Sequence, residues 1–123
     1  MTIPKIPMES HAVHSERLIA QAEEELTKGD RLQASEKAWG AVAHRLKVIA
    51  DHRGWEYTAH QHVYGVVRQL SDELEDQRIR DLFAYANGLH QNYYADATPL
   101  EELAHEIDRV KELLGMLQRV ELE

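Results

Sequence analysis

The chain has 123 residues, 43% of them apolar, which is enough for one folded domain with a hydrophobic core. Its 14 basic and 22 acidic side chains give a formal charge of −8, which argues against extensive binding to nucleic-acid phosphates. The absence of cysteine excludes disulfides and thiolate zinc sites, and no apolar run reaches the roughly 18 residues of a membrane span. The first ten residues, broken by Pro4 and Pro7, do not resemble a signal peptide, so we expect a cytoplasmic protein.

The first helix is predicted over Glu9–Lys28, where Leu18, Ala22 and Leu26 form one apolar line. Gly29 suits the left-handed position that ends a helix, and Asp30 suits the cap that begins the next one. Gln33 stands three residues after Asp30, as in a capping box.

The next three helices are predicted from apolar residues that recur at alternating intervals of three and four positions. A second helix over Arg31–His52 carries this pattern at Leu32, Ser35, Trp39, Val42, Leu46 and Ile49. A third helix that begins near Thr58 carries it at Val63, Val67, Leu70 and Leu74. A fourth helix that follows Asp76 carries it at Ile79, Phe83, Ala86, Leu89 (or His90) and Tyr93.

The last helix has the clearest start, because Thr98 suits the cap, Pro99 the first helical position and Glu101 the third. The same intervals recur along it at Leu100, Leu103, Ile107, Val110, Leu114 and Leu117. Its end is more apolar than one seam requires, which suggests docking on a partner subunit through Leu113, Leu117, Val120 and Leu122.

No segment shows the alternation of a β-strand, and short connections favour antiparallel neighbours. We therefore expect an extended lead over residues 1–8 and one domain over residues 9–123. The predicted fold is all-α, an up-and-down antiparallel helical bundle of four long helices plus a fifth. Glycines inside predicted helices cost about 1 kcal/mol each and indicate close helix approach, in the bundle or across a dimer, at Gly40, Gly65, Gly88 and Gly115. Beside Gly40 and Gly88 the alternative is room for a ligand.

Two blocks, residues 29–41 (GDRLQASEKAWGA) and residues 86–94 (ANGLHQNYY), carry a family resemblance together with the Gly54-Trp55 turn and His60. Over about residues 15–118 the chain resembles the PaREP family of small helical proteins of archaea and bacteria. That family is similar to a branch of the HEPN superfamily. The resemblance implies a helical bundle and a homodimer. It also implies one of two roles: a metal-independent ribonuclease, often a toxin, or a non-catalytic module associated with nucleotides or with a nucleotidyltransferase.

The ribonuclease motif of that superfamily is an arginine followed, after four to six residues, by a histidine on the penultimate long helix. His90 is the matching histidine here, but Phe83, Ala84 and Tyr85 occupy the positions where the arginine belongs. Arg45 and His52 have a fitting spacing elsewhere, and we interpret them as an ordinary surface pair. The motif therefore fails where it is expected, and we assign no catalytic residue.

Eight histidines raise the alternative of a histidine-based metal-binding helical protein. On a helix, His60 and His62 would point about 160° apart. His11 and His14 share a helix face near the start of the domain, and the single Glu102–His105 step is too little for a di-iron centre. We assign no metal ligand and no cofactor, and interpret as solvated or helix-end residues His11, His14, His44, His52 and His105.

A ligand-binding site is predicted between the second, third and fourth helices. Glu36 and Gly40 share a helix face, and Glu36 would meet His60 and His90 in a polar cleft, as a structural lock or as a pair that grips a ligand. Asn92 and Tyr94 complete the predicted set. The alternative for this face is simple packing, within the bundle or across a dimer.

These patterns favour a non-catalytic HEPN-like binding or interaction module that forms a homodimer and pairs with a nucleotidyltransferase-type protein or binds nucleotides. The first alternative is a metal-independent RNA-cleaving toxin of a toxin–antitoxin pair. The second is the histidine-based metal-binding protein.

Overall fold

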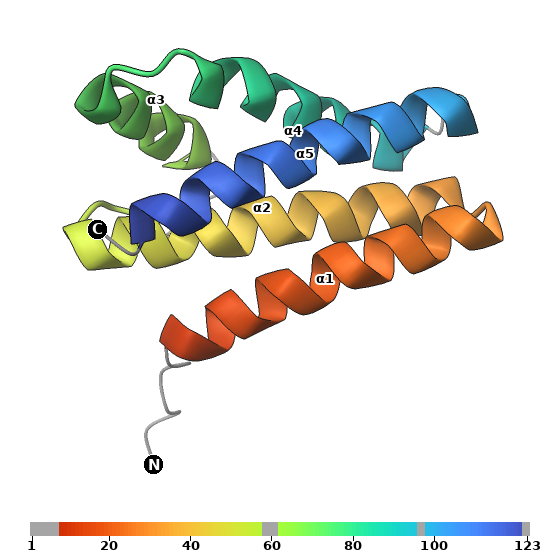
Figure 1. Cartoon of the computed structure of the whole chain (residues 1–123), viewed down its shortest axis with the longest axis horizontal. Coiled ribbons are helices and arrows are strands. Elements are labelled where there is room, and N and C mark those ends of the chain that lie inside the picture. Colours follow the sequence, from red (N-terminus) through yellow and green to blue (C-terminus); the bar gives the residue numbers. More distant parts are fainter. Residues whose placement is uncertain (1–7, 58–61, 96–97, 122–123) are drawn as a thin grey trace.

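The computed structural model describes residues 8–57, 62–95 and 98–121 of the chain. These residues contain no strand and form five helices, α1 (Met8–Lys28), α2 (Arg31–Arg53), α3 (His62–Leu74), α4 (Arg78–Ala95) and α5 (Leu100–Glu121). Figure 1 shows a bundle in which α3 is the short helix and the other four are long. The predicted all-α bundle is therefore confirmed.

The ends of α2 are fixed by the residues that the sequence suggested. Gly29 adopts the left-handed conformation with φ of 78°, and the Asp30 carboxylate accepts a hydrogen bond of 3.1 Å from the Gln33 backbone N–H. At the other end Gly54 has φ of 70°, and its N–H donates to the last carbonyls of the helix. Both turns need a residue that tolerates positive φ, which glycine does without strain.

The helix α2 is the centre of the bundle, because it contacts each of the other four helices. On one side it packs against α1, and on the other it meets α3, α4 and α5 (Figure 1). The short α3 packs on α2 and α4, whereas α1 has little contact beyond α2. Three helices therefore pack together on one side of α2, whereas α1 alone covers the other side.

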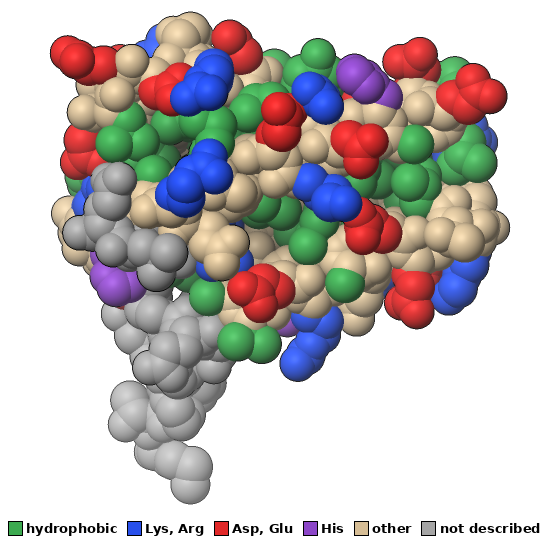
Figure 2. All heavy atoms as spheres, in the orientation of Figure 1, with side chains coloured by type: hydrophobic (Ala, Val, Ile, Leu, Met, Phe, Trp, Pro, Cys, Tyr) green, Lys and Arg blue, Asp and Glu red, His purple; other side chains and the backbone are tan. Residues whose placement is uncertain are grey.

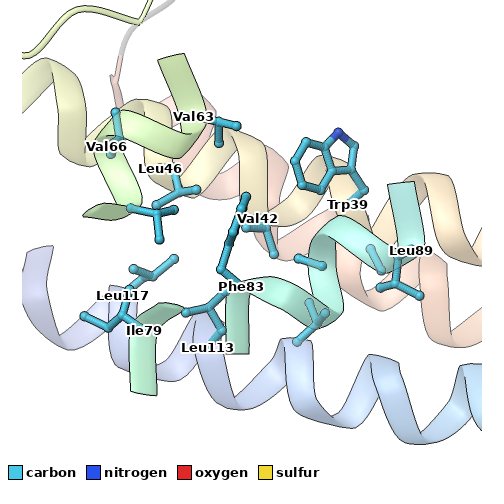
Figure 3. Close-up of a cluster of buried hydrophobic side chains, with 14 of the residues drawn as sticks. Trp39, Val42, Leu46, Val63, Val66, Ile79, Phe83, Leu89, Leu113 and Leu117 are labelled. Atoms are coloured by element: carbon cyan, nitrogen blue, oxygen red, sulfur yellow. The ribbon is translucent and has the colours of Figure 1, made fainter. Parts of the chain in front are cut away.

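The core lies where α2, α3, α4 and α5 face one another (Figure 3). The predicted seams supply most of its buried side chains, among them Val42, Leu46, Val67, Phe83, Leu89 and Ile107. Leu100 is an exception, because this first residue of α5 is 41% exposed. Leu113, Leu117 and Val120 are buried in the chain's own core, so the docking face predicted for them is wrong, and Leu122, the fourth residue of that prediction, lies outside the described residues.

Two helix starts differ from the prediction. The helix α3 begins at His62, and the predicted start at Thr58 lies outside the described residues. The helix α5 begins at Leu100, so Pro99 stands just before it, and the Pro99 carbonyl accepts the 2.9 Å hydrogen bond from the Leu103 N–H. Pro99 therefore stands at the position before the first helical residue, and the helix starts one residue later than predicted.

The helical glycines have different surroundings. A Cβ on Gly40 would lie 3.2 Å from Leu18 Cδ1, so this glycine permits the close approach of α1 to α2. A Cβ on Gly65, Gly88 or Gly115 would meet nothing within 4 Å. The predicted close approach is therefore confirmed at Gly40 alone. Among the described residues, no helix has the length and apolar character that a membrane span requires.

Candidate functional site

A hollow in the described part of the structure is lined by residues of α3 and α4 and by Glu56. It has a volume of about 630 Å³, which falls in the range of small-molecule sites. Its walls are Glu56, His62, Tyr64, Gly65, Val66, Val67, Arg68, Gln69, Arg80 and Phe83. We call it the α3–α4 cavity.

Two arginines line this cavity, one from each helix. Arg68 on α3 is exposed, and Arg80 on α4 is half-buried and donates a hydrogen bond of 3.2 Å from Nη2 to the Asp72 carboxylate. The cavity also contains a weaker pair, in which His62 Nε2 lies 3.7 Å from the Glu56 carboxylate. The wall therefore offers two permanent cations and one acidic side chain that already has a partner.

A row of aromatic rings connects this cavity with α2. The Tyr64 and Phe83 rings meet edge to face with centroids 5.7 Å apart, and the Phe83 and Trp39 centroids are 5.9 Å apart. The His90 imidazole then stacks on the Trp39 indole at 4.7 Å with an interplanar angle of 29°. The row also carries a polar link, because the Tyr64 hydroxyl donates a 2.9 Å hydrogen bond to Asn87 Oδ1.

The row fixes one wall of the cavity in place. Phe83 is buried, and Trp39 is 8% exposed, so both rings are held by the core. Tyr64, in contrast, is 48% exposed and lines the cavity. A planar ligand group could therefore lie against Tyr64 without disturbing the core.

The residues predicted for ligand binding are only partly brought together. His90 is half-buried on Trp39, whereas Glu36 is exposed and makes no hydrogen bond or ion pair with any described residue. Gly40 belongs to the interface with α1, against Leu18. His60 and the side chains of Asn92 and Tyr94 lie outside the described residues.

The predicted contact between Glu36 and His90 is therefore absent from the described part of the chain. The reason is a rotation about the α2 axis: Trp39, three positions after Glu36, is the residue that faces His90. Gly40 follows Trp39 by one position and so points about 100° away, toward α1. The meeting with His60 stays a prediction.

The residues that line the α3–α4 cavity were not identified from the sequence. A signal was present, because Tyr64 and Arg68 are four positions apart on an exposed face of α3 that adjoins the buried face of Val63 and Val67. An aromatic and a cation at that spacing share one exposed helix face. The sequence alone does not show that Arg80 of α4 lines the same cavity as these two residues.

A second hollow of about 400 Å³ lies between the start of α4 and the second half of α5. Three of its cations already have acidic partners, since Arg109 lies 2.7 Å from Glu112, Arg78 2.7 Å from Asp76 and Lys111 2.5 Å from Glu23. On the face shown in Figure 2, basic and acidic side chains are interspersed rather than gathered into one patch. Paired surface charges of this kind attract an anionic ligand weakly.

The α1–α2 interface contains polar groups as well. Ser15 Oγ donates a 2.6 Å hydrogen bond to the Ala41 carbonyl, and both residues are buried. Arg45 is 4% exposed, and its Nη2 lies 3.4 Å from the Ala12 carbonyl oxygen and 3.8 Å from the Glu16 carboxylate. The predicted surface pair of Arg45 and His52 is therefore wrong, because His52 is exposed and Arg45 faces α1.

Two groups have a pKa shifted by burial. Desolvation raises the pKa of the Tyr57 phenol to about 12, and its hydroxyl donates to the Ala43 carbonyl at 3.3 Å. Desolvation also raises the pKa of Glu106, with a further increase from the neighbouring charge of Glu102 and a decrease from His105. Neither group lines the α3–α4 cavity.

The comparison with family models identifies one family. The model of the archaeal PaREP1/PaREP8 family matches residues 10–114, which includes most of α1 to α5 and the whole α3–α4 cavity. No curated protein and no solved structure matches the chain. Among the described residues, no group of three or more histidine, aspartate or glutamate side chains is placed to hold a metal ion.

Proposed function

The chain belongs to the archaeal PaREP1/PaREP8 family, and we propose that it is a non-catalytic binding module that holds a small anionic ligand in the α3–α4 cavity. The ligand class that fits best is a nucleotide. It has a phosphate for the two arginines and a planar base for the exposed aromatic ring.

The observation that supports this proposal is that Arg68 of α3 and Arg80 of α4 line the same cavity as Tyr64. Guanidinium groups bind phosphate oxygens through charge-assisted hydrogen bonds, which are stronger than neutral ones. Bases stack on aromatic side chains with a gain of about 1–3 kcal/mol each. The exposed Tyr64 ring stands in a position to provide such a stack.

Binding is favoured over catalysis by the chemistry of the cavity wall. The described lining offers cations, an amide and aromatic rings, but no serine, threonine or cysteine nucleophile. His62 is the one histidine of that lining, and it is engaged with Glu56. His90, the histidine expected of a ribonuclease, lies against the Trp39 indole, where its stacked face is closed to substrate.

We further propose that the bundle is HEPN-like, that the protein acts in the cytoplasm as a homodimer, and that a nucleotidyltransferase-type protein is its partner. These proposals rest on the family resemblance and on the all-α fold. Mass measurement in solution and co-purification with a neighbouring nucleotidyltransferase test the last two directly.

The ligand proposal is tested by calorimetric titration of the full chain with adenosine monophosphate and triphosphate. Each of Arg68→Ala and Arg80→Ala should weaken binding by about tenfold or more, since a hydrogen bond to a charged group contributes about 1.5–3 kcal/mol. Arg17→Ala is the matched control, because Arg17 is an exposed arginine of α1 that lies outside the cavity. Tyr64→Ala should weaken the binding of the nucleotides but not the binding of inorganic phosphate.

Equal binding by Arg68→Ala, Arg80→Ala and Arg17→Ala would contradict the assignment of the cavity. The ribonuclease alternative is tested in parallel by incubating RNA with the protein and with His90→Ala. We expect intact RNA in both cases. Cleavage by the unmodified chain that His90→Ala abolishes would replace the binding function with an enzymatic one.

A further inference from the structure

An acidic side chain of α3 is placed next to the arginines of the α3–α4 cavity. Asp72 Oδ1 accepts the 3.2 Å hydrogen bond from Arg80 Nη2. Arg68 precedes Asp72 by four positions on α3, so the two side chains are neighbours on one helix face. On the basis of the nucleotide site proposed above, we infer that Asp72 sets the charge of the ligand. The cavity prefers a nucleotide whose phosphate is a singly charged diester to nucleotides with more negative charges.

Arg80 has only part of its guanidinium group left for a ligand. One N–H of Nη2 is taken by Asp72, and Nε is buried with no hydrogen-bond partner among the described residues. The donors that remain are those of Nη1 and the second N–H of Nη2. Two parallel N–H groups of this kind match the two unesterified oxygens of one phosphodiester. The geometry of Arg80 therefore suits one phosphate group rather than a chain of several.

The permanent charges around the cavity balance one another. Two guanidinium cations, Arg68 and Arg80, are accompanied by two carboxylates, Glu56 on the wall and Asp72 beside it. His62 lies 3.7 Å from Glu56 and adds a cation only when it is protonated. The first charge of a ligand gains direct contact with a guanidinium group. Each further charge finds no unmatched cation and is repelled by a chain whose formal charge is −8.

Asp72 is close enough to a bound phosphate to act on it. Since its carboxylate contacts Arg80, a phosphate on the other N–H groups of Arg80 lies within roughly 8 Å of it, about one Debye length at physiological salt. At this distance each added charge on the ligand weakens binding by about 1.5- to 2-fold, with screening included. ATP carries several more charges than a cyclic mononucleotide, so the effect accumulates for ATP.

The test titrates the full chain calorimetrically with cyclic AMP, AMP and ATP at physiological salt, without Mg²⁺, which would mask phosphate charge. We expect cyclic AMP to bind at least about threefold more tightly than ATP, with AMP between them. Asp72→Asn keeps an oxygen that can accept the N–H of Arg80 and removes the charge. It should therefore raise the affinity for ATP about threefold and that for cyclic AMP less than about twofold. Asp108→Asn, which removes an exposed carboxylate of α5 outside the cavity, is the matched control.

The side chain of Asp72 is 70% exposed, so Asp72→Asn should fold normally, which circular dichroism checks. Tighter binding of ATP than of cyclic AMP by the unmodified chain would overturn the inference about ligand charge. Equal ratios of ATP to cyclic AMP affinity in Asp72→Asn and Asp108→Asn would overturn it too. In both cases the nucleotide site stands if Arg68→Ala still weakens binding. No binding of any of the three nucleotides, or binding that Arg68→Ala and Arg80→Ala leave unchanged, would overturn the site and the inference together.

Discussion

Alanine at Gly88 should stabilise the protein, although glycine at this position interrupts a long helix. Gly88 lies inside α4 (Arg78–Ala95), it is exposed, and a Cβ built on it meets nothing within 4 Å. The substitution therefore adds a methyl group without a clash and removes the conformational freedom that glycine loses on folding.

The expected gain is about 0.8–1.0 kcal/mol, the difference in helix propensity between glycine and alanine. For a chain of this length that corresponds to an increase in Tm of about 3–5 °C. Urea unfolding followed by circular dichroism measures the free energy, and an unchanged slope shows that the unfolded state is the same.

Two other glycines provide the contrast that makes the reasoning testable. At Gly40 the added Cβ would lie 3.2 Å from Leu18 Cδ1, so the gain in propensity is reduced or reversed by crowding between α1 and α2. At Gly54 the φ of 70° makes alanine strained, with an expected loss of about 1–2 kcal/mol. A loss of stability in Gly88→Ala would refute the argument, because it would mean that Gly88 touches something that this chain alone does not supply, such as a second copy.

Three further predictions concern single side chains. Asp30→Ala should cost about 1 kcal/mol because the Gln33 N–H loses its acceptor, and Asp30→Asn, which keeps an oxygen there, should cost far less in the same urea measurement. The free energy of unfolding should fall as pH rises from 10 toward 12, because the unfolded Tyr57 loses its proton near 10.0 and the folded one near 12. Tyr57→Phe should flatten that fall, and an unchanged pH profile would contradict the burial of the phenol. Glu106→Gln should raise stability near neutral pH, since the folded protein disfavours the Glu106 carboxylate. The gain should vanish below about pH 4.5, where the acid is protonated even when unfolded, and a gain that persists there would exclude this cause.

The helices were predictable because each depends on its own stretch of sequence. The intervals of three and four positions between Trp39, Val42 and Leu46 predict which face of the helix is buried, whichever helix packs against it. The same holds for the turn at Gly29 and Asp30, where a left-handed glycine and a capping carboxylate are local requirements. Pro99 shows the limit, since a helix start is defined only to within a residue or two.

The candidate sites depend on how the helices are rotated against one another, and one sequence does not state that. Trp39 was correctly placed in the seam, but its stacking partner His90 follows from the angle at which α4 crosses α2. The contact between the His14 and His44 rings has the same origin, because the two residues are thirty positions apart on different helices and no sequence spacing relates them. Glu36 was predicted to enter a cleft, but the orientation of α2 about its own axis places this side chain in solvent.

Arg45 shows the same dependence most clearly, and it yields a prediction about how α1 is held. Its side chain is buried against α1, with Nη2 at 3.4 Å from the Ala12 carbonyl oxygen and 3.8 Å from Glu16, whose own side chain is 64% exposed. Arg45→Ala should therefore cost about 1.5–3 kcal/mol, because a charged hydrogen bond, an ion pair and stem packing are lost while Glu16 remains solvated. Arg45→Met, which keeps the stem, should cost less than half as much, and Lys47→Ala, an exposed control on α2, should change little. Since α1 packs almost entirely on α2, hydrogen exchange in Arg45→Ala should accelerate mainly along α1, and unchanged exchange there would show that this arginine does not anchor the helix.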